Sequence, residues 1–180
     1  GSINMYQPSD DSFLLVREVK ERAEGKSVLD MGAGFGILAE TAIKAKAKSV
    51  LAADIDYAVV SYCQAKGIPA IQSNLFSAIK GKFDLISFNP PYLPHDKRED
   101  EVSSRITTGG KKGDEIILKF LKGSIKHLNK NGIILLVISS LTPQSRITYL
   151  LTKLNMKKEI LSEEKMFMES LLVLKIAFNK

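Results

Sequence analysis

Apolar and polar positions change their period repeatedly along the chain, which predicts strands that alternate with helices. Apolar runs rich in β-branched residues predict strands at 27–32, 49–55, 69–75, 83–89 and 131–140. Apolar residues at helical spacing predict helices at 37–47, 57–67, 114–128 and 142–154. The segment 76–82 is too short for a crossover helix and predicts a turn, and 156–178 predicts two strands of a hairpin.

Two helix boundaries are predicted in more detail. The helix after residue 114 carries an apolar stripe that continues to residue 128, and this would place His127 near the helix C-terminus. The stripe consists of Ile117, Leu121, Ile125 and Leu128. Thr142 and Pro143 are typical of the N-cap and first residue of a helix, so we expect the last helix to begin there.

Alternating strands and helices predict an α/β fold, Rossmann-like, with a mostly parallel sheet covered by helices on both faces. In such sheets ligands bind at the carboxyl ends of the strands, near the point where the strand order reverses. Candidate functional residues are therefore sought at the strand ends.

Length and composition fit one domain over residues 1–180, in which Gly1 and Ser2 are interpreted as a cloning scar. The longest apolar stretch, at 132–141, is too short to cross a bilayer, so we expect a cytoplasmic protein without a membrane partner. The single cysteine, Cys63, excludes an internal disulfide and a cysteine-rich metal site, and no metal is expected. The net charge of +6 permits a nucleic acid partner, but the lysines are scattered as on solvated helix faces.

A glycine-rich loop follows the first predicted strand in "LDMGAGFG", with Gly32, Gly34 and Gly36 two residues apart and Asp30 before them. Glycines let the backbone turn tightly and let a ligand approach closely. The spacing differs from the G-x-G-x-x-G of dinucleotide-binding domains, and a carboxylate there would repel a pyrophosphate. A carboxylate suits an ammonium group, which predicts S-adenosylmethionine as cofactor and S-adenosylhomocysteine as product.

Polar residues at the next two strand ends extend the predicted cofactor site. Asp54 ends the second strand beside Ile55, and its carboxylate is suited to both ribose hydroxyls. Asn74 ends the third strand, where its amide and the Leu75 backbone are suited to the adenine edge. Asp56 competes with Asp54 for the ribose, but it is better placed as the N-cap of the following helix.

The fourth predicted strand ends in "FNPPYLP", where Asn89 interrupts an apolar run and two prolines follow. A planar nitrogen is a poor nucleophile, and two acceptors aimed at its N–H groups would hold it in line with a methyl donor. The Asn89 side-chain oxygen and the Pro90 carbonyl are the predicted acceptors, and Tyr92 would stack on the planar group. The alternative is a proline-rich turn that ends the strand.

"NPPY" with "LDMGAGFG" resembles the class I methyltransferases that modify planar nitrogens. "YQPSDDSFLL" (6–15) and "GGKKGDEII" (109–117) further resemble the short archaeal and eukaryotic branch of HemK-type glutamine methyltransferases. The resemblance implies a seven-stranded sheet with a C-terminal antiparallel hairpin, and Tyr6, Pro8, Asp11 and Ser12 over the cofactor. It departs from the branch in having no tryptophan before the paired glycines.

The same resemblance implies a substrate and a partner. The substrate would be the glutamine in the Gly-Gly-Gln tip of a translation release factor. Members of the branch work with a small zinc-binding activator, and a similar partner here would add to the edge strand near 69–75.

Three other functions stay open at this point. An RNA or DNA methyltransferase acting on exocyclic amines would use the same site, with the positive charge holding phosphates. A non-catalytic binding module would keep the fold but would not need Asn89. A dinucleotide oxidoreductase is disfavoured by Asp30 and the glycine spacing. His95 is not assigned as a general base, because amide methylation needs no strong base.

Overall fold

The computed structural model describes residues 10–90 and 113–180, and among them the side chains from Phe13 onward. The helices are α1 (Asp10–Arg22), α2 (Ile37–Lys44), α3 (Tyr57–Ala65), α5 (Glu115–Ser124) and α6 (Ser145–Lys153). The strands are β1 (Ser27–Met31), β2 (Ser49–Asp54), β3 (Ala70–Gln72), β4 (Phe83–Phe88), β5 (Leu128–Ser139), β6 (Met156–Met166) and β7 (Glu169–Phe178).

The strands form one seven-stranded sheet in the order β3-β2-β1-β4-β5-β7-β6. Strands β1 to β5 pair in parallel, and β7 pairs antiparallel with both β5 and β6. The strand order reverses between β1 and β4, which is where ligands bind in sheets of this kind. The predicted fold, a mostly parallel sheet with a C-terminal antiparallel hairpin, is confirmed.

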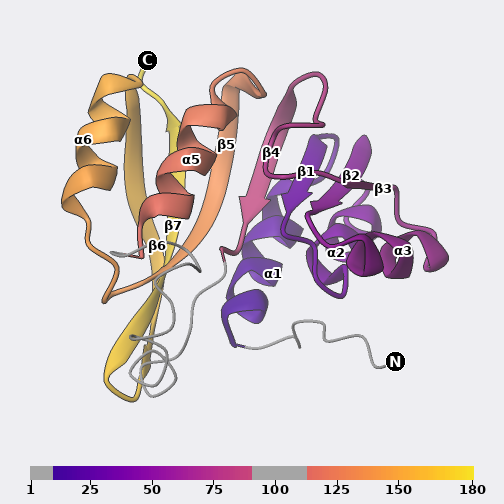
Figure 1. The fold of residues 1–180 in the computed structure, drawn as a ribbon, viewed down its shortest axis with the longest axis horizontal. Helices are drawn as coiled ribbons and strands as arrows, with labels where there is room; N and C mark the ends of the chain where they lie inside the picture. Colours follow the sequence, from indigo (N-terminus) through magenta and orange to yellow (C-terminus); the bar gives the residue numbers. More distant parts are fainter. Residues whose placement is uncertain (1–9, 91–112) are drawn as a thin grey trace.

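Helices cover both faces of the sheet. One apolar cluster joins α5, α6 and the turn after β3 to one face, with Phe120 fully buried at its centre. Two further clusters join α1, α2 and α3 to the other face. Figure 1 shows α5 and α6 beside the orange and yellow strands, and α1 to α3 beside the indigo and magenta strands. The predicted two-sided covering is therefore present, and it leaves the carboxyl ends of the strands uncovered by these helices.

Several predicted boundaries are wrong in position. Helix α5 ends at Ser124, and Leu128 begins β5 instead of closing the helix. His127 therefore lies between the two elements, where its Nδ1 lies 2.8 Å from the Gly81 carbonyl oxygen. Strand β3 is shorter than the predicted 69–75.

The last helix also begins later than predicted. Its N-cap is Gln144 and its first residue Ser145, in place of Thr142 and Pro143. Thr142 instead donates its N–H to the Ser139 carbonyl at 3.0 Å, which closes a turn directly after β5. The helix can start only after this turn.

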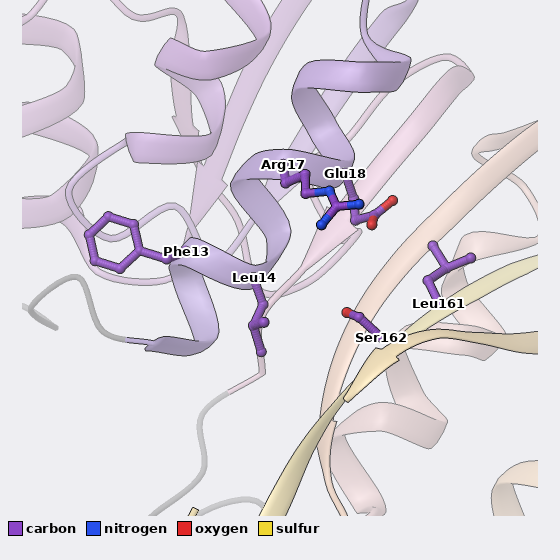
Figure 2. A pocket seen from close by; sticks show the side chains of 6 residues that line it. All are labelled: Phe13, Leu14, Arg17, Glu18, Leu161 and Ser162. Atoms are coloured by element: carbon purple, nitrogen blue, oxygen red, sulfur yellow. The ribbon is translucent and has the colours of Figure 1, made fainter. Parts of the chain in front are cut away.

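An irregularity in β6 leaves a shallow groove against α1. The pairing of β6 with β7 shifts register between Ile160 and Ser162, so Leu161 forms a bulge. Figure 2 shows Leu161 and Ser162 across from the side chains of Arg17 and Glu18. The volume of about 170 Å³ is below the range of sites for cofactor-sized ligands.

Within residues 10–90 and 113–180, none of the helices has the length and apolarity that a membrane crossing requires. The same residues contain no group of three or more His, Cys, Asp or Glu side chains placed to hold a metal ion.

Candidate active site

The glycine loop connects β1 to α2 and takes a conformation that requires its glycines. Gly32, Gly34 and Gly36 have positive φ angles of 76°, 54° and 81°, a region that residues with a Cβ rarely adopt. The N–H groups of Gly32 and Ala33 both donate to the Ala53 carbonyl, at 2.8 and 3.2 Å. The loop is thereby tied to the end of β2 as it leaves β1.

Gly32 lies directly beside Asn89. A Cβ built on Gly32 would be 3.6 Å from the Asn89 backbone oxygen and 3.9 Å from the Phe88 ring. The glycine loop and the end of β4 therefore line the same space, as the sequence predicts. A side chain at position 32 would stand between the loop and the asparagine.

Gly36 has a different neighbourhood, because it faces the protein interior. A Cβ there would lie 2.8 Å from Ile68 Cδ1 and 3.4 Å from Cys63 Sγ. Gly36 is also the N-cap residue of α2. Gly36 therefore lies where α2 packs against α3 and the residues that follow it. Its predicted role as a cofactor residue stays a prediction.

Asp54, at the end of β2, is held by backbone N–H groups. Its Oδ2 accepts from Gly34 at 3.4 Å and its Oδ1 accepts from Asp56 at 2.9 Å. A carboxylate has about four lone-pair sites, so both oxygens keep capacity for further donors. Asp56 caps α3 as predicted, with Oδ1 accepting from the Ala58 N–H at 2.9 Å. Asp54 is thus oriented toward the glycine loop, and Asp56 is used by its helix.

Asp30 lies buried beneath the loop, with 1% of its surface exposed. Its Oδ1 accepts a hydrogen bond from Ser87 Oγ at 3.0 Å, on the neighbouring strand β4. Its Oδ2 has no hydrogen-bond partner among the described residues, although the dipole of the Ala39 N–H acts on the carboxylate. A buried carboxylate oxygen without a donor is costly, so this atom is suited to receive a donor from a ligand.

The electrostatic state of Asp30 follows from these surroundings. Burial raises its pKa from 3.8 to about 7, the Ser87 hydrogen bond opposes this rise, and the charge of Asp54 adds to it. Near neutral pH a substantial fraction of Asp30 is therefore protonated in the free protein. A cationic ligand group beside it would favour the charged form.

The turn after β3 holds the predicted adenine-side residues. Ser73 Oγ donates to the Leu75 carbonyl at 2.6 Å and accepts from the Ala78 N–H at 3.0 Å. Leu75 has a positive φ of 51°, and Asn74 is exposed. Ile55 is 64% exposed beside Asp54. Ile55 directly follows the end of β2, so its predicted role stays a prediction, whereas Asn74 lies in the turn beyond β3 and not at the strand end.

Asn89 and Pro90 directly follow β4, and both are described. Asn89 is half-buried and Pro90 is buried. The strand end is fixed from the other face, because the ring of Phe88 stacks on that of Phe120 with centroids 4.2 Å apart. The backbone that carries Asn89 is therefore anchored in the core.

The remaining predicted residues lie outside what the structure describes. Tyr6, Pro8 and Tyr92 belong to the undescribed ranges, and Asp11 and Ser12 lie in α1 without described side chains. Their roles stay predictions.

Two residues near the site were missed by the sequence analysis. Ser87 lies within the apolar run that predicts the strand 83–89, and a hydroxyl in a strand buried on both faces needs a polar partner. Cys63, on α3, places its Sγ 3.7 Å from the Gly34 carbonyl oxygen. Burial, with the charges of Asp30 and Asp54, raises the pKa of this thiol to about 11, so it packs under the loop as a neutral group.

Taken together, these residues fit S-adenosylmethionine. Asp30 offers a buried carboxylate oxygen for a cationic group, and Asp54 offers acceptors for hydroxyls. Gly32 leaves room for a ligand at the point where Asn89 lies within reach. Asp30 and Asp54 place two carboxylates beside the loop, and their negative charge would repel a pyrophosphate.

Comparison with known proteins gives a family match over most of the chain. The family model of the methyltransferase small domain matches residues 8–168. A protein of Methanocaldococcus jannaschii, named as a candidate protein N5-glutamine methyltransferase, is 33% identical over 178 residues, covering 94% of this chain and 90% of the relative.

Solved structures agree with the fold. The structure of the E. cuniculi Mtq2-Trm112 complex, responsible for methylation of the eRF1 translation termination factor, superposes with a TM-score of 0.74 at 24% identity, covering 98% of this chain and 100% of that one. The T. thermophilus 16S rRNA N2 G1207 methyltransferase RsmC, in complex with AdoMet and guanosine, gives a TM-score of 0.71 at 22% identity, covering 99% of this chain and 45% of that one.

The prediction of a methyltransferase is confirmed by the family match, since the matched residues include the glycine loop, Asp54 and Asn89. This chain belongs to the methyltransferase small domain family.

Proposed function

We propose that this protein transfers a methyl group from S-adenosylmethionine to the side-chain nitrogen of a glutamine in a protein, most specifically the Gly-Gly-Gln glutamine of a translation release factor. The observation that carries the proposal is the adjacency of Gly32 and Asn89, whose backbone oxygen would lie 3.6 Å from a Cβ on the glycine. The glycine loop, which suits the methyl donor, and Asn89, which suits the amide that receives the methyl group, therefore line the same space.

The chemistry requires orientation more than acid or base catalysis. S-adenosylmethionine supplies an electrophilic methyl group on a sulfonium centre. A carboxamide nitrogen has its lone pair delocalised, so its reactivity depends on how it is held. The Asn89 side-chain oxygen and the Pro90 carbonyl would accept hydrogen bonds from its two N–H groups, which raises electron density on the nitrogen and fixes its direction of approach. The nitrogen takes the methyl group as the S–CH3 bond of the donor breaks, and one of its two N–H protons is lost to water.

Asp30 and Asp54 bind the donor in this proposal. Asp30 Oδ2 would accept a hydrogen bond from the ammonium group at the donor's amino-acid end, and the carboxylate of Asp54 would accept hydrogen bonds from the ribose hydroxyls. Ser87 orients Asp30 through its hydrogen bond of 3.0 Å. Ile55 would pack against the adenine, and Asn74 with the Leu75 backbone would bond its edge.

Glutamine as the substrate is supported by the Methanocaldococcus jannaschii relative, which matches over almost the whole of both chains. The acceptor pair of Asn89 and Pro90 also suits an exocyclic base amine. An RNA guanine or adenine is therefore the second candidate, supported by the fold shared with the rRNA methyltransferase and by the net charge of +6.

A small activator subunit is part of the proposal. Among the described residues, strand β3 pairs only with β2 and forms one edge of the sheet, where a partner strand can add. The Ala70 carbonyl on this strand accepts from the exposed Gln64 side chain at 3.1 Å, so Gln64 would have to move when a partner strand pairs there. The Mtq2 complex with Trm112 supports the kind of partner.

The test is transfer of labelled methyl from S-adenosylmethionine to a purified release factor, followed by mapping of the label. The reaction should contain the activator subunit if one co-purifies. We expect label on the glutamine of the Gly-Gly-Gln peptide. Label on RNA added at equal concentration, with none on the release factor, would replace this function with the second candidate.

A further inference from the structure

The β6–β7 hairpin ends in a turn with exposed apolar side chains. Met166 and Glu169 pair at the end of the ladder, so Phe167 and Met168 form a two-residue turn. Phe167 is 87% exposed and Met168 57%, and Met166 beside them is 38% exposed. Phe167 is the most exposed of the large hydrophobic side chains in the described residues. Such a group in water is unfavourable unless it has a partner surface.

The backbone of this turn is strained for the residue it carries. Met168 has a φ of 67°, in the left-handed region that favours glycine or asparagine at a hairpin turn. A glycine would adopt this conformation at lower cost, so the backbone does not favour the methionine. Strain of this kind concentrates where side chains are kept for contact with another molecule.

The register of the sheet places the turn beyond the candidate active site. Phe88, which precedes Asn89, is level with Leu136 on β5, and Leu136 is level with Leu174 on β7. From Leu174 to Met168 the hairpin continues in the direction in which β4 ends. These six residues span about 20 Å at the usual rise of a strand. In Figure 1 the yellow hairpin turn reaches well past the arrowhead of β4.

The hairpin is fixed at its base, so its turn is held in a defined place. Ser139 Oγ, at the end of β5, donates to the carboxylate of Glu169, which is 8% exposed. The Ser140 N–H donates to the Ser170 carbonyl and its Oγ accepts from the Ser170 N–H, each at 2.8 Å. A projection that is already ordered loses little entropy when it binds.

The charges beside the turn select the kind of partner. Glu163, Glu164 and Lys165 precede Met166 on β6, with Glu163 and Lys165 exposed and Glu164 half-buried, and their net charge is negative although the chain carries +6. A phosphate backbone would be repelled here. An apolar depression on a protein, with basic residues at its rim, is complementary to this turn.

We propose that the apolar turn at Met166, Phe167 and Met168 docks the protein substrate at a point about 20 Å beyond the site of methyl transfer. This proposal rests on the proposed function, and it adds the surface by which a folded substrate protein is distinguished from a short peptide. The turn binds the body of the substrate while the glutamine enters beside Asn89.

The experiment compares a full-length release factor with a short peptide that carries its Gly-Gly-Gln tip. In Phe167→Asp we expect the KM for the release factor to rise about tenfold or more, as for an aromatic residue at the centre of an interface. The kcat, the KM for the peptide and the affinity for S-adenosylhomocysteine should be unchanged. Tyr149→Asp is the matched control, because Tyr149 on α6 is 65% exposed and lies outside the hairpin.

A second variant separates docking from folding. Met168→Gly relieves the positive φ, so we expect its melting temperature to rise by about 2–4 °C while the KM for the release factor also rises. A variant that is more stable and yet binds its substrate less well cannot be explained by loss of structure.

Four outcomes would overturn the docking proposal. The first is an unchanged KM for the release factor in Phe167→Asp with normal wild-type transfer, which leaves the proposed function intact. The second is a wild-type dimer that becomes monomeric in Phe167→Asp, which would assign the turn to a second copy of the chain. The third is loss of RNA binding in the same variant. Failure of the wild type to methylate either release factor or peptide would overturn the proposed function and the docking proposal with it.

Discussion

The two halves of the sheet differ in the length of their strands. β1, β2, β3 and β4 have 5, 6, 3 and 6 residues, whereas β5, β6 and β7 have 12, 11 and 10. The short strands end close to one level, so their loops meet and form one site. The long strands of the hairpin pass that level and carry side chains away from it.

The two halves of the sheet also differ in the size of the side chains that pack against them. Beneath the glycine loop the cluster is built from small residues such as Ala33, Ala39, Ala52 and Cys63, which let backbones approach each other. The buried residues of the hairpin include the larger Leu171, Val173 and Leu174, which stiffen it. The first half therefore fixes the distances around a small ligand, and the second fixes how far the hairpin extends toward a protein substrate. Substitutions should separate the two roles.

The largest expected effect is that of Asn89→Ala. Loss of an acceptor that orients the nucleophile should lower kcat by about 10²–10³-fold for protein and peptide alike. The affinity for S-adenosylhomocysteine, measured by calorimetry, should change less than about threefold. If the donor affinity falls as steeply as kcat, Asn89 contributes to donor binding and not only to orienting the nucleophile.

Asp30→Asn should change stability and donor affinity in opposite directions. The folded-state pKa of about 7 lies above the ordinary 3.8, so the folded protein holds a proton that the unfolded chain has lost between these values. The contribution of Asp30 to the free energy of unfolding thus falls as pH rises from about 4 to 7, by up to about 4 kcal/mol. The asparagine variant should lack this fall and be more stable at pH 8, in thermal melts across the pH range.

The pH dependence of donor affinity tests the charge state of the same carboxylate. The ammonium group of S-adenosylhomocysteine favours the charged form of Asp30, so wild-type affinity for this ligand should rise with pH up to about 7 and then level off. Asp30→Asn should bind more weakly above pH 7 and show a flatter profile. A wild-type profile that is flat between pH 5 and 8 would contradict this assignment.

Gly36→Ala and Gly67→Ala form a matched pair for the packing beneath the loop. Both glycines have positive φ, 81° and 83°, but only a Cβ at position 36 meets other atoms, at 2.8 Å from Ile68 Cδ1. Gly67→Ala should cost about 1 kcal/mol from the backbone alone, and Gly36→Ala about 1–2 kcal/mol more from overpacking. Denaturant unfolding measures both, and equal losses would mean that the packing yields without cost.

Ser87→Ala should have the smallest effect, and it should sharpen the role of Asp30. Its hydroxyl opposes the rise of the Asp30 pKa, so removing it should raise that pKa further. The pH at which donor affinity levels off should then move upward, with a loss of a few-fold at pH 7. Ser124→Ala is the control, because the buried Ser124 donates to Leu121 within its own helix at 2.7 Å. A pH profile that is the same in Ser87→Ala and wild type would exclude a positioning role.

The sequence predicts this fold well where local pattern and contacts agree. The boundary of α5 is wrong because a long-range contact competes with the helical pattern there. Asn129 donates to Asp84 at 2.8 Å, and Asp84 also accepts from Ser27 on β1, so β5 is drawn into the sheet from residue 128. Such bonds join residues far apart in sequence, and no local spacing reveals them.

The candidate site follows the same rule. Asp30, Gly32, Asp54 and Asn89 are found from sequence because strand ends in a parallel sheet meet at one edge. Ser87 is not, because its partnership with Asp30 depends on the register of β1 against β4, in which these two residues are opposite each other. The hairpin turn likewise looks like an ordinary apolar segment until its exposure is known.

The position of Cys63 has a practical consequence. It is the only cysteine of the chain, and it is fully buried beneath the backbone of Gly34 with its pKa raised to about 11. A thiol reagent can label it only during brief excursions in which α3 separates from the loop above it. The labelling rate therefore measures how often α3 separates from the loop, without any introduced probe. A ligand bound at the loop should lower this labelling rate.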